Sequence, residues 1–279
     1  MKHSFTKRGS MVFEQLIKAE WVYKKYHAFL LGLLYTILGI VSARLIFRSS
    51  SGIMSVAFTS ILLVPSLAEL LRLEANQALE SYNFSIRRLW RDHSDIFAVY
   101  LFLFLGIFVA YSFSTLLMPQ ADVGQLFTAQ LSTAGLKGFA VVNAQLMSII
   151  MNNVLVFVVS FLLSLIYGAG AIIFLVWNAS VWGVVFSLFV RKAAMASGAD
   201  PVVMFAQDLL PFLPHMVTEG AAYVGAAMIG GIVSKAVLRE EVFSQQFRYV
   251  MYDALAFLVF GILLVVIAGI IEVKWFAGL

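Results

Sequence analysis

Seven apolar stretches recur along the chain, with more polar segments between most of them. Their approximate ranges are 28–47, 52–71, 96–117, 148–166, 169–190, 210–233 and 250–272. About 20 apolar residues cross a bilayer as a helix, and a segment in lipid must satisfy its own backbone hydrogen bonds. Runs such as 154–159 lack the alternating polarity of barrel strands. The pattern therefore predicts an all-α fold, a polytopic integral membrane helical bundle of about seven transmembrane helices.

Three further segments have a helical pattern of their own. Residues 1–27 place apolar side chains at helical spacing among lysines, which predicts a cytoplasmic juxtamembrane amphipathic helix, on the membrane surface or packed on the bundle. Residues 72–95 predict a charged cytoplasmic helical connection, which either docks a partner or packs under its own bundle. Residues 118–147 have almost no charge and predict a short helix at the outer interface, with or without a cavity beneath it. Residues 28–279 are expected to form a single transmembrane domain.

Composition supports the membrane class and excludes several others. The chain is 62% hydrophobic and 12% charged, whereas soluble domains carry roughly 25% charged residues. Its net charge of +4 is explained by basic residues beside the spans, which predicts contact with anionic lipids and no nucleic-acid partner. The absence of cysteine excludes disulfides and thiolate sites. The mixed, charged first 27 residues predict an internal signal anchor in place of a cleavable signal peptide.

The distribution of basic residues predicts the orientation. With the N-terminus inside the cell, the inner segments hold thirteen of the 19 lysines and arginines and the outer segments hold six. Because basic residues in short loops stay on the cytoplasmic side, the protein is predicted to lie in the cell membrane with a cytoplasmic N-terminus and an external C-terminus. Only Tyr167 and Gly168 separate the fourth and fifth spans, and a re-entrant unit there would invert the later topology.

Small residues and prolines predict features of individual spans. Gly220, Gly225 and Gly230 recur every five residues and so are spread around the sixth span. Small residues let helix backbones approach closely in lipid, so this span is predicted to be central in the bundle. Small-residue faces also predict a homo-oligomer, with a dimer favoured. Pro65 is expected to kink the second span or to end it near Val64.

The first candidate for chemistry is the stretch from Leu213 to Gly220. Pro211 and Pro214 fit a helix start, and His215 and Glu219 lie one helical turn apart on the same face, where they could share a hydrogen bond. This pair is a proton relay, a ligand clamp, half of a metal site, or a structural pair that locks the helix to its neighbours. No metal is predicted, because a metal needs further ligands and the histidines are only His3, His27, His93 and His215.

Three asparagines complete the candidate intramembrane polar cluster. Asn152 and Asn153 lie near the start of the fourth span, and Asn178 lies midway along the fifth. Each could bond a neighbouring helix, including a partly unwound backbone near His215, or contribute to a ligand site. The common nucleophile, zinc-protease and phosphate-loop motifs are absent, so no enzyme, catalytic residue or cofactor is predicted.

The order of these motifs resembles a known family. The series 150–153 (Ile-Met-Asn-Asn), 168–170 (Gly-Ala-Gly), Asn178 and 213–215 (Leu-Pro-His) with Glu219 resembles the stage II sporulation protein M family over roughly 95–272. Residues 1–94 resemble the N-terminal extension of archaeal and other non-sporulating members. The resemblance implies a non-catalytic membrane scaffold, since the family's namesake recruits peptidoglycan-remodelling enzymes, and it implies roles for Asn152, Asn153, His215 and Glu219.

Three functions follow as hypotheses. The first is a scaffold or assembly factor that recruits or organises membrane and envelope partners. The second is a transporter or permease subunit, in which the polar residues line a water-filled cavity near mid-membrane. The third, ranked last, is an intramembrane enzyme that uses His215 or Glu219 as a general acid or base.

Overall fold

The computed structural model describes residues 24–47, 50–79, 86–137, 145–168, 172–241 and 244–277. They form α2 (Lys25–Ile46), α3 (Ser51–Leu79), α4 (Ile86–Leu117), α5 (Gln120–Leu126), α6 (Thr128–Lys137), α7 (Gln145–Tyr167), α8 (Ile172–Ser197), α9 (Pro201–Arg239) and α10 (Gln245–Ala277). Seven of these helices are long and apolar enough to cross a membrane, and none of the described residues is in a strand. The predicted all-α polytopic bundle is confirmed.

The fourth and fifth predicted spans are separate helices. They correspond to α7, with 23 residues, and α8, with 26 residues, and each is long enough to cross the bilayer by itself. Gly168 follows α7 with a φ of 60°, a left-handed conformation that glycine adopts without strain. Gly198 has the same role after α8, with a φ of 73°. The connection from α8 to α9 therefore takes only residues 198–200.

One of the two alternatives for Pro65, an end of the second span near Val64, is excluded, and the predicted helix start at Pro211 and Pro214 is wrong. The helix α3 continues to Leu79 through Pro65 and does not end near Val64. Pro211 and Pro214 do not start a helix, because α9 begins earlier and contains both. Proline is tolerated inside membrane helices, since neighbouring groups satisfy the backbone groups that it leaves free.

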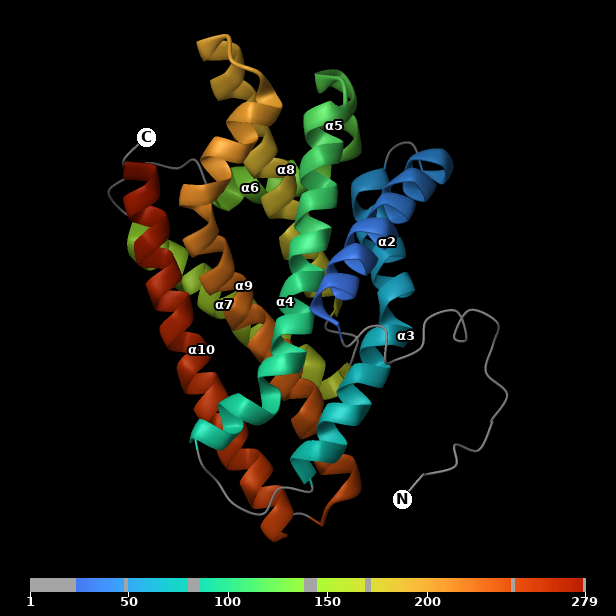
Figure 1. The fold of residues 1–279 in the computed structure, drawn as a ribbon, viewed down its shortest axis with the longest axis vertical. Coiled ribbons are helices and arrows are strands. Elements are labelled where there is room, and N and C mark those ends of the chain that lie inside the picture. Colours follow the sequence, from blue (N-terminus) through green and yellow to red (C-terminus); the bar gives the residue numbers. More distant parts are fainter. Residues whose placement is uncertain are drawn as a thin grey trace.

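The true start of α9 has its own sequence signal. Asp200 is the N-cap, and its Oδ1 accepts hydrogen bonds from the backbone N–H groups of Val202 at 2.8 Å and Val203 at 3.1 Å. Pro201 occupies the first turn, where its missing N–H costs nothing. With 39 residues, α9 is about 58 Å long and exceeds the roughly 30 Å hydrocarbon core. The turn between α8 and α9 accordingly projects at one end of the bundle (Figure 1).

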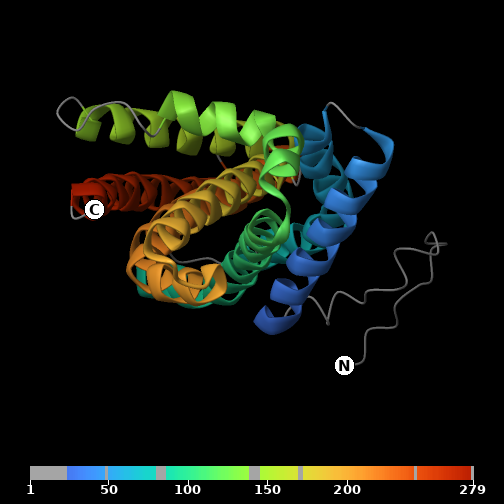
Figure 2. The same cartoon turned by 90° about the horizontal axis from the view of Figure 1, so that it is seen from above.

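Helix α9 lies at the centre of the bundle, as its glycine pattern predicts. It contacts α3, α4, α7, α8 and α10, and all of residues 219–233 are buried. Figure 2 shows α7 and α10 together on one side of the bundle, with α2 and α3 on the opposite side. The outward faces of α2, α7 and α10 carry exposed leucine, isoleucine, valine and methionine side chains. These faces are suited to lipid.

Residues 118–137, the described part of the segment between α4 and α7, are folded into one end of the bundle. This part contains α5 and α6, so a helix is present as predicted, but it is not only a surface element. Phe127 is fully buried and packs edge-on against Tyr111, with ring centroids 5.8 Å apart. Gln130 is also buried and donates a hydrogen bond to the carbonyl of Gly52 at 3.1 Å. The predicted N-terminal amphipathic helix, except for its last residues, lies outside the described residues, as do residues 80–85 and 138–144 of the other two predicted connections.

Arg191 on α8 stabilises the end of α4. Its Nη1 donates to the carbonyl oxygen of Thr115 at 2.9 Å, in the last turn of α4, and to that of Met118 at 2.7 Å, the residue that follows the helix. A cation near the negative end of a helix dipole is favourable, so Arg191→Met should lower the free energy of unfolding by about 1 kcal/mol. Chemical denaturation in detergent measures this loss. The exposed neighbour Lys192 provides the control Lys192→Met, and equal losses in the two variants would contradict the capping role.

Candidate functional site

His215 and Glu219 form a buried pair on the inner face of α9. Each residue is only 4% exposed. Helical geometry puts them one turn apart, and His215 Nε2 lies 3.3 Å from Glu219 Oε2. The contact foreseen from their spacing is therefore present. Burial of both groups in a membrane bundle is costly unless each is compensated, so the surrounding contacts matter.

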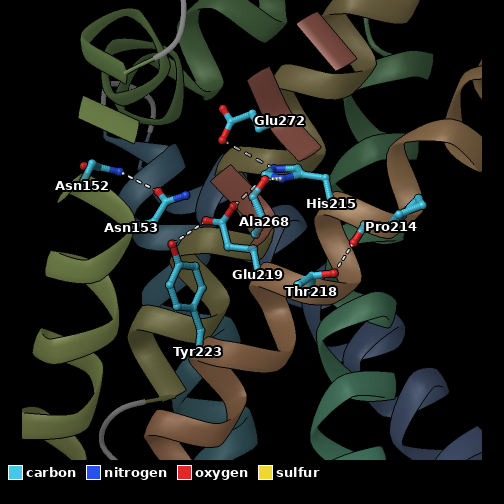
Figure 3. A network of polar contacts seen from close by, with 9 residues as sticks. All are labelled: Asn152, Asn153, Pro214, His215, Thr218, Glu219, Tyr223, Ala268 and Glu272. Carbon is cyan, nitrogen blue, oxygen red and sulfur yellow. Dashed lines mark hydrogen bonds and ion pairs between the residues drawn. The ribbon is translucent and has the colours of Figure 1, made fainter. Parts of the chain in front are cut away.

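A third ionisable residue, Glu272 on α10, completes the cluster. Its Oε2 lies 3.9 Å from His215 Nε2, and its side chain is 19% exposed. One ligand atom from each of His215, Glu219 and Glu272 lies within 4.8 Å of the other two. Sequence reasoning missed Glu272, although a carboxylate at the far end of the last apolar stretch was a signal for it. These three residues are called the triad below (Figure 3).

A backbone contact fixes the orientation of the imidazole. His215 Nδ1 lies 3.2 Å from the carbonyl oxygen of Ala268, one turn before Glu272 on α10. A carbonyl oxygen only accepts, so Nδ1 carries the hydrogen in this contact. The other ring nitrogen, Nε2, is the atom that faces both carboxylates. Helix α10 thus contributes a carboxylate and an orienting carbonyl.

Tyr223 holds the remaining oxygen of Glu219. Its hydroxyl donates a hydrogen bond to Glu219 Oε1, and the tyrosine is 2% exposed. Tyr223 lies one turn after Glu219 on α9, so His215, Glu219 and Tyr223 repeat at helical spacing along one face. Sequence reasoning missed Tyr223 because an aromatic residue in an apolar run is typical of a core position. The hydrogen bond leaves Glu219 Oε2 directed at the imidazole.

Aromatic side chains enclose the imidazole. The ring centroids of Trp182 on α8 and Phe212 on α9 each lie 5.4 Å from that of His215. Phe186 stacks on Phe212 at 4.7 Å, so the aromatic group continues along α8. These rings fix the position of the histidine and provide an apolar surrounding in which electrostatic interactions are strong.

Asn153 brings α7 to the same site. It is 5% exposed, and its Oδ1 accepts a hydrogen bond from Asn152 Nδ2 at 3.0 Å. Its own Nδ2 is buried and has no hydrogen-bond partner in the described part of the chain. In Figure 3 the amide of Asn153 lies on the side of the triad that Glu219 and Tyr223 occupy. The asparagine pair therefore bonds internally and presents one unused amide group toward the triad.

Two other predicted members have local roles. Asn178 is 6% exposed, and its Nδ2 donates to the carbonyl oxygen of Phe174 on its own helix at 2.7 Å. Pro214 is exposed, and its carbonyl accepts a hydrogen bond from Thr218 at 2.6 Å. Neither has a hydrogen bond to the triad in the described part of the chain. The cluster of the structure thus contains His215, Glu219 and Asn153, reaches Asn152 through Asn153, and adds Glu272 and Tyr223.

The triad lies toward one end of the bundle. Glu272 is one residue from the end of the candidate span Gln245–Val273, and α9 runs antiparallel to α10, so His215 lies in the first half of α9. The end concerned is the one that also carries α5, α6 and the turn between α8 and α9 (Figure 1). Chemically, two carboxylates and an imidazole in this position can bind a proton or a cation.

The comparisons with known proteins agree with the residue pattern. The family model of stage II sporulation protein M matches residues 97–275, which run from α4 to α10 and include the whole triad. No curated protein and no solved structure gives a significant match. The match covers more than half of the 279 residues, and the structure has the seven apolar helices of a multi-pass membrane protein. The chain belongs to the stage II sporulation protein M family.

Proposed function

We propose that this protein is a non-enzymatic membrane scaffold or assembly factor that organises other membrane or envelope proteins. The observation that carries the proposal is the location of its polar residues. His215, Glu219, Asn153 and Asn178 are each 4–6% exposed, and all lie in contacts between or within helices. Polar groups that hydrogen-bond across helices in lipid fix the packing of a bundle. The triad links α9 to α10 and thereby gives the scaffold a defined shape.

The transporter alternative is supported less well by the geometry. Substrate sites of secondary transporters lie near the membrane midplane, where discontinuous helices line a cavity. Here α9 runs without a break from Pro201 to Arg239, and the triad lies toward one end of the bundle. Its histidine is enclosed by Trp182 and Phe212. These features favour a packed structural contact.

The proposed scaffold is a homodimer in the cell membrane with a cytoplasmic N-terminus. The exposed apolar faces of α2, α7 and α10 are available to lipid, to a second copy or to a partner's helix. Gentle extraction followed by native mass spectrometry tests the assembly role. The expected particle contains two copies of the chain and another membrane or envelope protein in a fixed ratio. A particle with one copy and lipid alone would contradict the proposal.

Cysteine accessibility scanning separates the scaffold from the transporter. The chain has no cysteine, so single cysteines at Thr218, Ala222, Asn153 and Asn178 report only their own position. A membrane-impermeant thiol reagent is applied to the native oligomer in right-side-out and inverted vesicles. Protection at all four positions is expected, because a packed contact admits no reagent. Periodic labelling on the α9 face would support a water-filled cavity and reject the packed scaffold.

Positive controls come from the two ends of the bundle. Single cysteines at Ala199 and Glu241, which are exposed and flank α9, should be labelled from opposite sides of the membrane. The predicted orientation places Ala199 outside and Glu241 inside. Reversed labelling of the two controls would overturn the orientation but leave the result at the triad valid.

A further inference from the structure

Three atoms with lone pairs converge at the triad. His215 Nδ1 uses its hydrogen for the Ala268 carbonyl, so in the neutral imidazole Nε2 is an acceptor. It faces Oε2 of Glu219 at 3.3 Å and Oε2 of Glu272 at 3.9 Å. Hydrogen-bond acceptors at such distances repel each other unless a proton or a cation lies between them. A proton or a metal ion between these three atoms would balance the arrangement.

The spacing of the three atoms suits a metal ion. In a tetrahedral zinc site with bonds of about 2.0–2.2 Å, neighbouring ligand atoms lie roughly 3.4 Å apart. The 3.3 Å separation of His215 and Glu219 already matches this value, and the 3.9 Å separation to Glu272 is slightly longer. One ligand atom from each of the three residues lies within 4.8 Å of the other two, so the proposed site needs a contraction of its longer distances to the roughly 3.4 Å of zinc geometry. With a side chain that is 19% exposed, Glu272 is the least buried of the three ligands.

The groups behind the triad have the arrangement found around metal ligands. A histidine that binds a metal usually donates its other N–H to a carbonyl or carboxylate, and a metal-bound carboxylate is itself hydrogen-bonded. The Ala268 carbonyl meets the first condition for His215, and the Tyr223 hydroxyl meets the second for Glu219. Each of these two contacts uses the other polar atom of its side chain, so His215 Nε2 and Glu219 Oε2 face each other (Figure 3).

The negative charge of the two carboxylates also favours a divalent metal ion at the triad. Two carboxylates carry −2, so a divalent cation with a neutral imidazole makes the site electrically neutral, whereas an imidazolium leaves it at −1. A net charge in a membrane interior is costly, and the aromatic rings of Trp182 and Phe212 keep the surroundings apolar. A neutral cluster is therefore the favoured state if both carboxylates remain ionised.

We propose that His215, Glu219 and Glu272 bind one divalent transition-metal cation, with Zn²⁺ as the reference ion, and that the ion ties α9 to α10. Imidazole and carboxylate ligands are suited to zinc, manganese and iron. Three protein ligands leave a fourth position for water. Asn153 lies beside Glu219 in Figure 3, and its buried Nδ2, which has no hydrogen-bond partner among the described residues, is the donor that we assign to such a water. The proposal concerns the triad alone and holds whether or not the chain is a scaffold.

Metal analysis of the full-length protein tests the proposal. The protein is purified in detergent without a histidine tag, treated with chelator, dialysed against Zn²⁺ or Mn²⁺, and analysed by mass spectrometry for bound metal. One ion per chain is expected. Glu272→Gln should weaken binding by about 100-fold or more, and Tyr223→Phe by about 10-fold, because loss of an orienting partner typically costs 10–100-fold. The control Glu241→Gln changes an exposed carboxylate outside the triad and should bind as the wild type does.

A second measurement needs no variant. Zn²⁺ should raise the thermal unfolding midpoint of the wild-type protein, and chelator should reverse the shift, since an ion that binds only the folded state stabilises it. A site balanced by a proton alone would bind substoichiometric metal and show the same midpoint with Zn²⁺ and with chelator. Either that result, or equal metal content in wild type and Glu272→Gln, would overturn the proposal.

Discussion

Replacing His215 with alanine is expected to lower the free energy of unfolding by about 3–5 kcal/mol, the typical cost of leaving a buried carboxylate without its partner. In this variant Glu219 and Glu272 remain close together without the imidazole between them. The aromatic pocket formed by Trp182 and Phe212 would also lose its central ring. Unfolding in a denaturing detergent series, followed by circular dichroism, measures the loss.

A double variant distinguishes charge repulsion from simple loss of packing. In His215→Ala with Glu272→Gln, one of the two facing carboxylates is neutral, so the repulsion that remains in the single variant is removed. The double variant should therefore be more stable than the sum of the two single losses predicts, by about 1–2 kcal/mol. Strictly additive losses would show that His215 acts through packing alone.

The seven helices could be predicted because the property that produces them is local. A run of apolar residues that is long enough to cross a bilayer has few alternatives to a helix, whatever its neighbours are. The contact between His215 and Glu219 could also be predicted from local sequence, because residues one helical turn apart lie on the same face. Helix boundaries were less predictable. Helix α9 begins at the capping signal of Asp200, and Pro211 and Pro214 lie inside the helix without starting or ending it.

The rest of the site depends on which helices pack together, and the sequence does not show this. His215 meets Ala268 across 53 positions of the chain, and that contact is what places Glu272 beside the imidazole. Asn178 illustrates the opposite case. Its position within a span suggested a contact between helices, but its amide has a backbone acceptor one turn earlier on its own helix. A polar side chain in lipid needs a hydrogen-bond partner, and a backbone carbonyl of its own helix satisfies it as well as a group on a neighbouring helix does.

The same dependence on packing separates two glycines of α9. A Cβ atom at Gly230 would lie 2.6 Å from the carbonyl oxygen of Phe161 and 2.7 Å from Ser164 Cβ, both on α7. A Cβ atom at Gly225 would have no atom within 4 Å. Both glycines are buried in the central helix and belong to the same five-residue repeat, so the sequence alone gives them equal roles.

Gly230→Ala is accordingly expected to lower the free energy of unfolding by about 2–3 kcal/mol, because the added methyl group forces α7 and α9 apart where backbone atoms cannot yield. Gly225→Ala should leave stability unchanged or raise it by up to about 1 kcal/mol, since it fills open space and favours the helix. Unfolding of the two variants under the same detergent conditions measures the difference. Equal losses would mean that α7 does not pack against α9 at Gly230.

A hydrogen bond lies in the same contact, because Ser164 Oγ donates to the Ala227 carbonyl. Ser164→Ala removes this bond without adding a methyl group, so its loss in the free energy of unfolding should be smaller than that of Gly230→Ala. That result would show that the close approach of the helices, and not this bond, sets the larger effect.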